Sequence, residues 1–479
     1  MKMFLILLCV LAANCFAADE TVTFNKHIAP ILFQNCSACH RPGEVAPFNL
    51  LSYEDAKKRS KQLARVTAEK VMPPWKAAPG HGEFRDARVL TDEQIGLIKR
   101  WHEAGAPEGL AADLPPVPKF PDGWQLGEPD LILTMSEEFS VPAEGRDVFR
   151  CFVLPINNSE DVYVKAVEYR PGNRKVVHHA LLFLDSSGAA RKKDEADEGP
   201  GYASFGGPGF VPSGGLGGWA PGATPHPLPE GIAKVVKKNS DLALQLHLHP
   251  TGKVEKEKSQ IGIYFAKEPP KKSVAPLALG TRNIDIAPGD NNYTVRDSMT
   301  LPIDVEILSI TPHAHLICKE IKADATLPDG STKPVIWIKD WDFNWQDQYM
   351  YVQPLKLPKG TRLDVFFRYD NSAENPNNPR NPPGRVKFGE QTENEMAFLF
   401  MQAVVENKLQ AAQLLLAMAA KRLNGAGGGA GLGAARAFGG GEDKNELLKE
   451  LRKKYDANGD GKLTREELEA AAKEMNGLK

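Results

Sequence analysis

The chain has 479 residues, with 59 lysines and arginines against 61 aspartates and glutamates, so its formal net charge is −2. A nucleic-acid-binding protein usually presents a strongly basic face, and this charge balance predicts no nucleic-acid partner. The length exceeds what a single core usually organises, which predicts several domains. Glycine (42 residues) and proline (37 residues) are frequent, and this favours short strands and turns over long helices.

The N-terminus has the pattern of a secretory signal. A positively charged start precedes a short apolar run from Phe4 to Ala13, and the small residues Cys15 and Ala17 predict cleavage after Ala17. The run is too short to span a bilayer, and no later stretch is long and apolar enough to do so. We therefore expect residues 1–17 to be a signal peptide. The mature protein is then expected to be periplasmic or secreted and not membrane-spanning.

Helical periodicity follows over residues 22–107. In the segment 91–105, Thr91 followed three residues later by Gln94 predicts the start of a helix. Residues 108–124 are rich in proline and lack periodicity, which predicts a semi-rigid linker.

A CxxCH motif lies inside this helical region, at Cys36, Cys39 and His40. Two thiols one turn of chain apart can add to the vinyl groups of haem, and the adjacent histidine then lies beneath the iron as its axial ligand. Met72 is the strongest candidate for the sixth ligand because a thioether stabilises ferrous iron. His81 and His102 are weaker candidates for that position.

Haem attachment is favoured over the other uses of a CxxC pair. A zinc site of this type needs a second CxxC, and a thioredoxin-like site needs a surrounding βαβ pattern; neither is present. Residues 22–107 resemble the cytochrome c-like domains that are fused to other modules in exported bacterial proteins. The resemblance implies an α-helical cytochrome c domain that binds haem c covalently.

From residue 125 to residue 405 the chain consists of short runs rich in β-branched and aromatic residues, separated by turn residues. This texture predicts two β-sandwich (jelly-roll) domains, over 125–275 and 276–405. A glycine-rich insert at 199–222 is expected to form a long loop that shapes the substrate entrance. Residues 406–442 predict a helix followed by a flexible glycine-rich linker.

Six of the eleven histidines form three short clusters in the β region: His178 and His179, His247 and His249, His313 and His315. Residues i and i+2 of a strand point to the same face, so each HxH pair can hold one metal ion. The adjacent pair can share a metal only where a bulge or strand end turns one of the two side chains. Neutral imidazole suits copper, zinc, iron or nickel. The clusters therefore predict at least one metal site.

Four segments in this region, VVHHALLF, LQLHLHPTG, TPHAHLICK and ENEMAFLF, resemble in order the ligand strands of the type 2 copper, ascorbate-dependent monooxygenases. That family includes peptidylglycine α-hydroxylating monooxygenase and dopamine β-monooxygenase, and the resemblance covers residues 125–405. It implies that His178, His179 and His247 hold an electron-supplying copper. It also implies that His313, His315 and Met396 hold the catalytic copper that binds dioxygen.

The implied activity is hydroxylation of a C–H bond in a small organic substrate with dioxygen. The haem domain or an external donor would supply the electrons. The peptide-amidating members carry an arginine two residues before their HxH pair, where this chain has Thr311, which argues against a peptidylglycine substrate. The disulfide-rich framework of the family is missing, because only Cys151 and Cys318 remain outside the signal and the haem motif. His249 shares a strand face with His247 and is the alternative ligand.

The C-terminal residues 443–479 contain a match to the EF-hand calcium loop. The resemblance implies six calcium ligands: Asp456, Asn458, Asp460, Lys462 (through its carbonyl), Thr464 and Glu467. The whole pattern thus predicts a multidomain chain with an α-helical cytochrome c domain, two β-sandwich domains and a C-terminal helical EF-hand. Its expected cofactors are haem c, two copper ions and calcium.

Two other functions remain open at this point. His313 and His315, followed by Glu320, resemble the first metal-binding motif of the cupins, which would indicate a non-haem iron dioxygenase in a jelly roll. The chain could also be a non-enzymatic electron-transfer or metal-binding protein. Copper with Met396 distinguishes the monooxygenase from the dioxygenase, which would use iron with Glu320.

Overall fold

The computed structural model describes residues 21–44, 46–121, 123–205, 207–389 and 391–424, and five residues closer to the C-terminus (453, 455, 456, 459 and 467). The expected signal peptide lies outside these residues. The chain divides into two compact units: Met1–Pro74 with Arg88–Lys119, and Trp75–Ala87 with Phe120–Lys479. None of the described helices is both long and apolar enough to cross a membrane.

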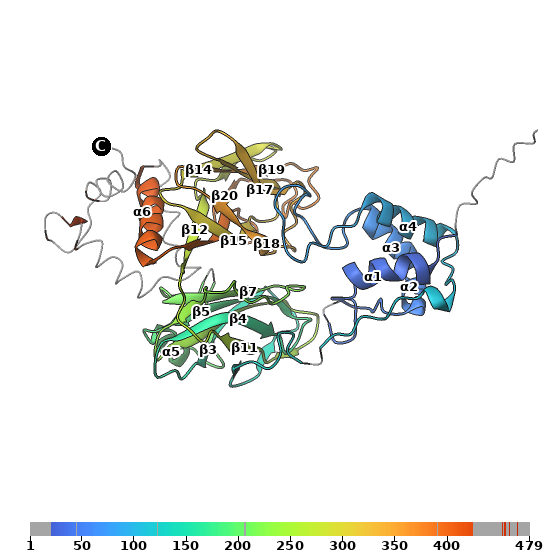
Figure 1. Cartoon of the computed structure of the whole chain (residues 1–479), viewed down its shortest axis with the longest axis horizontal. Coiled ribbons are helices and arrows are strands. Elements are labelled where there is room, and N and C mark those ends of the chain that lie inside the picture. The colour runs from blue at the N-terminus through green and yellow to red at the C-terminus, as the bar shows by residue number, and fades with distance from the viewer. Residues whose placement is uncertain are drawn as a thin grey trace, which may run out of the picture. The chain divides into compact units, whose positions relative to one another are not determined.

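The first unit consists of short helices around a small core (Figure 1). Its elements are η1 (Phe24–Ile28), α1 (Ala29–Asn35), α2 (Tyr53–Lys58), α3 (Ser60–Ala68), α4 (Asp92–Glu103) and η2 (Ala111–Asp113). The predicted start of α4 is confirmed: the Thr91 hydroxyl accepts a hydrogen bond from the Gln94 N–H, and the Gln94 side chain accepts one from the Thr91 N–H. Trp101 of α4 is fully buried and packs against Phe24 of η1.

The predicted fold class is wrong for the chain as a whole. Strands make up 35% of the chain and helices 16%, so the protein is mostly β-sheet. Neither a distinct cytochrome-type helical domain nor a helical EF-hand is shown by the described residues. The reason is that the helical patterns of the first unit produce helices of only 5 to 12 residues apart from a three-residue turn. The alternating β-branched pattern, by contrast, extends over most of the second unit.

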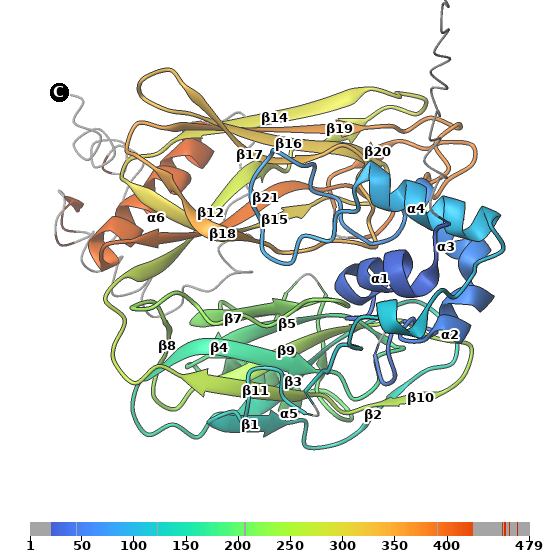
Figure 2. The same ribbon diagram turned by 45° about the vertical axis from the view of Figure 1, so that its right-hand side comes forward.

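The first half of the second unit holds two sheets that pack face to face (Figure 2). One has the strand order β6-β3-β9-β5-β7 and the other β1-β11-β4-β8, with a small β10-β2 pair beside them. The strands are β1 (Leu131–Thr134), β2 (Phe139–Val141), β3 (Val148–Pro155), β4 (Val162–Arg170), β5 (Val177–Asp185), β6 (Tyr202–Ala203), β7 (Gly214–Trp219), β8 (Lys234–Val236), β9 (Asp241–Leu248), β10 (Glu255–Glu257) and β11 (Gln260–Phe265), and helix α5 (Ala189–Glu195) follows β5.

The second half repeats this arrangement with the sheets β12-β21-β15-β18 and β14-β19-β16-β17, and a small β13-β20 pair. Leucines, isoleucines and valines from both sheets meet in one continuous core. The elements are β12 (Ser273–Thr281), β13 (Asp285–Ile286), β14 (Tyr293–Thr300), β15 (Val305–His313), β16 (Cys318–Thr326), β17 (Thr332–Ile338), β18 (Tyr349–Leu357), β19 (Arg362–Tyr369), β20 (Val386–Lys387), β21 (Ala397–Val405) and α6 (Lys408–Asn424).

The expectation that residues 199–222 form one long loop is wrong in part. Residues 214–219 form strand β7, which pairs with β5 at the edge of the five-stranded sheet. Glycine is favoured here because the strand runs so close to its neighbour that a side chain would not fit. A Cβ at Gly218 would lie 2.9 Å from the Ala180 carbonyl oxygen. The described residues between β6 and β7 form no further helix or strand.

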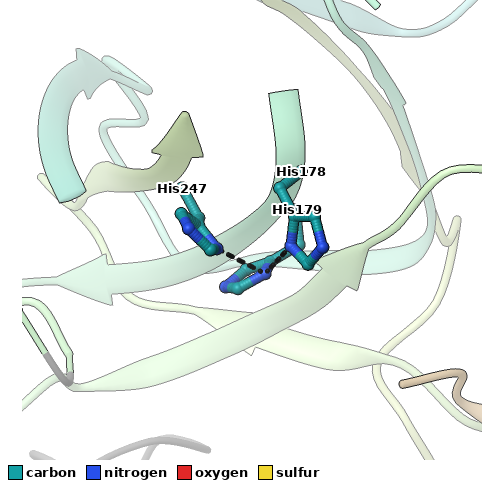
Figure 3. A group of neighbouring side chains, drawn as sticks. All are labelled: His178, His179 and His247. Atoms are coloured by element: carbon teal, nitrogen blue, oxygen red, sulfur yellow. Dashed lines mark hydrogen bonds between the residues drawn. The ribbon is translucent and has the colours of Figure 1, made fainter. Parts of the chain in front are cut away.

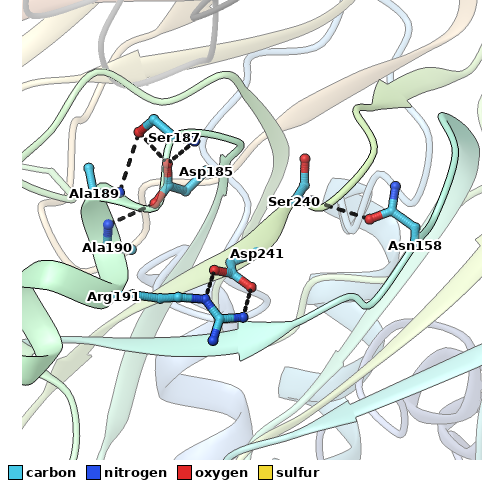
Figure 4. A network of polar contacts seen from close by, with 8 residues as sticks. All are labelled: Asn158, Asp185, Ser187, Ala189, Ala190, Arg191, Ser240 and Asp241. Atoms are coloured by element: carbon cyan, nitrogen blue, oxygen red, sulfur yellow. Dashed lines mark hydrogen bonds and ion pairs between the residues drawn. The ribbon is translucent and has the colours of Figure 1, made fainter.

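Strands β5 and β9 are held in register by a polar network at one end (Figure 4). Asp185 faces Asp241 across the two strands. Asp185 accepts hydrogen bonds from the backbone of Ser187 and Ala190, at 2.8 and 2.7 Å, and Asp241 accepts two from the Arg191 guanidinium, at 2.6 and 2.7 Å. Each carboxylate therefore has its own donors, which offsets the repulsion of facing like charges. A slip of one residue would break this network and reverse every side chain on β9.

Candidate metal centres

The opposite end of the same strand pair carries three histidines. Across β5 and β9, Val177 pairs with Leu248 and His179 pairs with His247, so the register shifts between Val177 and His179. His178 is therefore the extra residue of a β-bulge. A regular strand would point adjacent side chains to opposite faces, and the bulge removes that restriction. From the sequence, His178 and His179 were expected to share a metal only if a bulge or strand end turned one of them. The structure contains such a bulge.

The three imidazoles converge through the same type of nitrogen (Figure 3). The Nδ1 atom of His179 lies 3.3 Å from Nδ1 of His178 and 3.4 Å from Nδ1 of His247. One ligand atom from each histidine lies within 4.8 Å of those of the other two. Among the described residues, this is the group of histidine, cysteine and carboxylate side chains that comes close enough to hold an ion. The structure thus brings together the first predicted ligand set.

Burial keeps two of these histidines neutral. It lowers the pKa of His178 to about 4, with repulsion from His247 adding to the effect, and lowers the pKa of His179 well below its usual value. Neutral imidazole is the form that binds a transition metal, because protonation removes the lone pair. A donor set of three imidazoles fits copper, zinc, iron or nickel.

His247 is fixed on two sides. The Phe149 ring of the neighbouring strand β3 stacks on it at 4.2 Å between centroids. Its Nε2 lies 2.7 Å from Oδ2 of Asp147, and the other oxygen of that carboxylate lies 2.7 Å from Nδ1 of His249. The hydrogen bond to His247, partly opposed by burial, lowers the pKa of Asp147 to about 2, so this side chain is a carboxylate. His249 is 67% exposed and stands outside the converging group, which favours His247 as the ligand.

The second predicted ligand set lies where β15 ends and β21 begins. His313 is the last residue of β15 and pairs with Phe398 of β21, which places it beside Met396. Its Nε2 lies 3.2 Å from the Met396 sulfur. The ring of His315 follows just beyond the strand, with its centroid 5.3 Å from that of His313. All three side chains therefore meet at one end of this sheet.

Both rings of this second set are oriented through Nδ1. Nδ1 of His313 lies 2.7 Å from the Gln346 side-chain oxygen, and Nδ1 of His315 lies 3.1 Å from the Asn394 carbonyl. Since both partners are acceptors, each Nδ1 carries the proton and each Nε2 keeps its lone pair. Burial lowers the pKa of His313 and lowers that of His315 to about 3. Two neutral imidazoles with one thioether form a soft donor set that suits Cu(I).

Glu395 holds the turn that joins these ligands. Its fully buried carboxyl group accepts hydrogen bonds from the backbone N–H groups of His315 and Ile317, both at 2.8 Å, and from Met396 at 3.2 Å. One side chain thus fixes the backbone of two of the three candidate ligands. This role was not predicted, because His315 and Ile317 lie about eighty residues away from Glu395 along the chain.

We predict that Glu395→Ala lowers the free energy of unfolding by about 2–4 kcal/mol, because it leaves buried N–H groups without an acceptor. Copper binding at His313, His315 and Met396 is expected to weaken as well. Chemical denaturation and copper titration measure the two effects. Glu395→Gln keeps an acceptor oxygen and serves as the matched control with the smaller loss. Equal stability of the alanine and wild-type proteins would show that the turn does not depend on this carboxyl group.

The CxxCH motif of the first unit folds as one tight turn after α1. The N–H groups of Cys39 and His40 both donate to the Cys36 carbonyl, at 3.2 and 2.9 Å. The two cysteines are not joined in a disulfide. Nδ1 of His40 lies 3.0 Å from the Phe48 carbonyl, so Nδ1 carries the proton and Nε2 keeps its lone pair. Burial lowers the pKa of His40 and raises that of Cys36 to about 12. A neutral histidine beside two thiols on one turn fits covalent haem.

The candidates for a sixth iron ligand are placed differently. Met72 follows α3 in the first unit, where its N–H donates to the Val66 carbonyl, and no described hydrogen bond links it to His40. Nδ1 of His102 lies 3.0 Å from the Ser60 hydroxyl. His81 belongs to the second unit, where its ring packs against Trp337.

Three further predicted features have mixed outcomes. Glu320 accepts hydrogen bonds from Trp337 (2.7 Å) and Arg368 (3.2 Å), and it does not join His313 and His315 in any close group among the described residues. Cys151 and Cys318 are both free and buried. Asp456 accepts a hydrogen bond from the Gly459 N–H. Of the other calcium candidates Glu467 is described, while Asn458, Asp460, Lys462 and Thr464 lie outside the described residues.

Comparison with known proteins adds little. No protein-family model matches the chain, and no curated protein matches its sequence. The VP2 subviral particle of infectious bursal disease virus is similar over 57% of this chain and 70% of its own, with 10% identity and a TM-score of 0.15. BuGH86 in complex with neoagarooctaose is similar over 73% of this chain and 47% of its own, with 8% identity and a TM-score of 0.13. Likenesses this weak carry no argument about fold or function.

Proposed function

We propose that this protein is an exported, copper-dependent monooxygenase that hydroxylates a C–H bond of a small organic substrate. The observation that carries the proposal is the presence of two separate ligand groups of different chemistry in the second unit. One has three imidazoles that meet through Nδ1, and the other has two imidazoles beside a thioether. Their composition and order agree with the resemblance to the type 2 copper, ascorbate-dependent monooxygenases.

The two groups differ in what they stabilise. His178, His179 and His247 would hold a copper ion that accepts and passes on electrons, since three imidazoles tolerate both of its oxidation states. His313, His315 and Met396 would hold the copper ion that meets dioxygen, since the thioether favours Cu(I). When bound, the two ions supply the two electrons with which dioxygen and two protons convert a C–H group into an alcohol and water.

The residues of the chain prepare both groups for binding. Gln346 and the Asn394 carbonyl hold the protons of His313 and His315 at Nδ1, so that both Nε2 atoms remain available. Burial keeps these side chains neutral, so that no proton has to leave when a metal binds. Glu395 fixes the backbone on which His315 and Met396 are placed.

The first unit would supply electrons. We propose that Cys36 and Cys39 carry covalent haem with His40 as an axial ligand, in keeping with the tight turn and the free Nε2 of His40. Such a haem accepts single electrons from an external donor and releases them at a potential that its axial ligands set. The enzyme would then need less ascorbate as an electron donor than the family that it resembles.

The test is metal analysis coupled to oxygen uptake on full-length protein matured in a bacterial periplasm. We expect two copper ions and one haem iron per chain, and reductant-dependent oxygen uptake with a substrate library. Uptake should yield one alcohol per dioxygen consumed. Retained copper without oxygen uptake would indicate an electron-transfer or metal-binding protein instead. Iron in place of copper in the second unit would contradict the copper assignment.

A further inference from the structure

The side chain of Asp147 stands between two histidines of the LQLHLHPTG segment at the first ligand group. It lies just before β3, and its two oxygens contact Nε2 of His247 and Nδ1 of His249, each at 2.7 Å. Asp147 is 34% exposed and His249 is 67% exposed, whereas His247 is only 7% exposed. The carboxylate therefore links a buried candidate ligand to an exposed histidine that is not one.

We infer that Asp147 is a positioning residue that holds His247 in the tautomer and orientation needed to bind copper through Nδ1, and that His249 in turn orients Asp147. This inference rests on the proposed copper site and extends it to a residue beyond the ligands.

The geometry explains why one nitrogen is chosen. A carboxylate only accepts hydrogen bonds, so its contact with Nε2 places the ring proton there and leaves the lone pair on Nδ1. Nδ1 of His247 is the atom that lies 3.4 Å from Nδ1 of His179. Without Asp147 the ring could carry its proton on either nitrogen, and one of the two neutral tautomers would present an N–H to the metal. A carboxylate partner also increases the electron-donating strength of the imidazole.

His249 gains a role from the same contacts. Its separation from His247 by a single residue makes it the alternative ligand in the sequence, but its Nδ1 is engaged by the second oxygen of Asp147. With both oxygens bonded, the carboxylate cannot turn away from His247. Phe149, stacked on the His247 ring, restricts the remaining rotation.

The experiment uses the full chain with His313→Ala, in which copper binding reports on the first ligand group alone. The Cu(I) dissociation constant is measured by competition with a chromophoric chelator. Asp147→Asn and Asp147→Ala are expected to weaken binding about 10- to 100-fold, and Asp147→Glu to restore part of it. The thermal midpoint of the copper-free protein should fall slightly, because the two hydrogen bonds of Asp147 are lost. A merely structural residue would lower this midpoint and leave the copper affinity unchanged. Asp324→Asn, at a similarly exposed Asp–Lys pair, is the matched control with unchanged affinity.

His249→Ala distinguishes the two roles of that histidine. We expect a loss of less than about 10-fold, and no further loss when it is combined with Asp147→Ala, because both changes disrupt one unit. Wild-type affinity in both Asp147 variants would overturn this inference and leave the copper site standing. A greater loss with His249→Ala than with His247→Ala would overturn it as well, by making His249 the ligand. Failure of the His313→Ala protein to bind any copper would overturn the inference together with the proposed function.

Discussion

His313→Ala is expected to abolish substrate hydroxylation and to reduce the copper content from two ions per chain to one. The substitution removes one imidazole from a site of three ligands and leaves the Met396 sulfur without its close neighbour. Loss of residues that only orient a ligand typically costs about 10- to 100-fold in metal affinity, so loss of a ligand should cost at least about 100-fold. His178→Ala should likewise remove one copper, from the other group. Copper content by mass spectrometry and oxygen uptake measure these effects.

The matched control is His226→Ala. His226 pairs with Asp86 through Nε2 and belongs to neither ligand group, so its loss should leave both copper ions and the activity unchanged. The double variant His178→Ala with His313→Ala should bind no copper. If either single variant, still folded, lost both ions, the two groups would form one site and the assignment of separate roles would fail.

Replacing both Cys36 and Cys39 by alanine is expected to remove covalent haem completely while leaving the copper content unchanged. The thioether bonds need both thiols, and the copper ligands belong to a different compact unit. Haem absorption after denaturation and gel electrophoresis measures covalent attachment. Oxygen uptake driven by a donor that reduces haem should fall to background, whereas uptake driven by a small reductant that reaches copper directly should persist.

Ala38→Ser is the control for this change, because Ala38 lies exposed between the two cysteines and takes no part in attachment. It should retain haem and full donor-driven uptake. Donor-driven uptake that survives in the haem-free double variant would contradict the proposed electron route. That result would leave the proposed copper sites and the proposed hydroxylation activity standing.

The histidine clusters were predictable because the ligand types, their spacing and their order appear in short local segments. The HxH pattern at His313 and His315 was expected to present both rings to one metal, and the structure places them together with Met396. For His178 and His179, the sequence predicted only that a bulge or strand end would be needed for both side chains to bind one metal ion. The bulge itself depends on how β5 pairs with β9, which is a relation between strands about sixty residues apart.

Other features could not be predicted for the same reason. Asp147, Gln346 and Glu395 meet their histidines only through the folded topology, across separations of 33 to 100 residues. No local pattern marks them as partners of a metal ligand. The glycine-rich segment was predicted to be a loop because its composition is typical of one. Part of it forms strand β7 instead, where the close approach to β5 leaves room only for glycine at Gly218. The predicted fold class was wrong because helical periodicity in the first unit produces only short helices, whereas the β region is far longer.

The polar network at one end of β5 and β9 helps to fix the position of the histidines at the other end. Because Asp185 and Asp241 are held by α5 and its preceding turn, the strand pair is fixed at one end and the histidines are aligned at the other. The placement of His178, His179 and His247 thus depends on the register of this strand pair. A ligand group held in this way by the strands is already arranged before a metal ion binds.

Anomalous diffraction at the copper absorption edge, from crystals of the copper-loaded protein, tests the two-site arrangement most directly. We predict two peaks in each chain, one among the Nδ1 atoms of His178, His179 and His247, and one between His313, His315 and the Met396 sulfur. A single peak, or a peak that involves Glu320 in place of Met396, would contradict it.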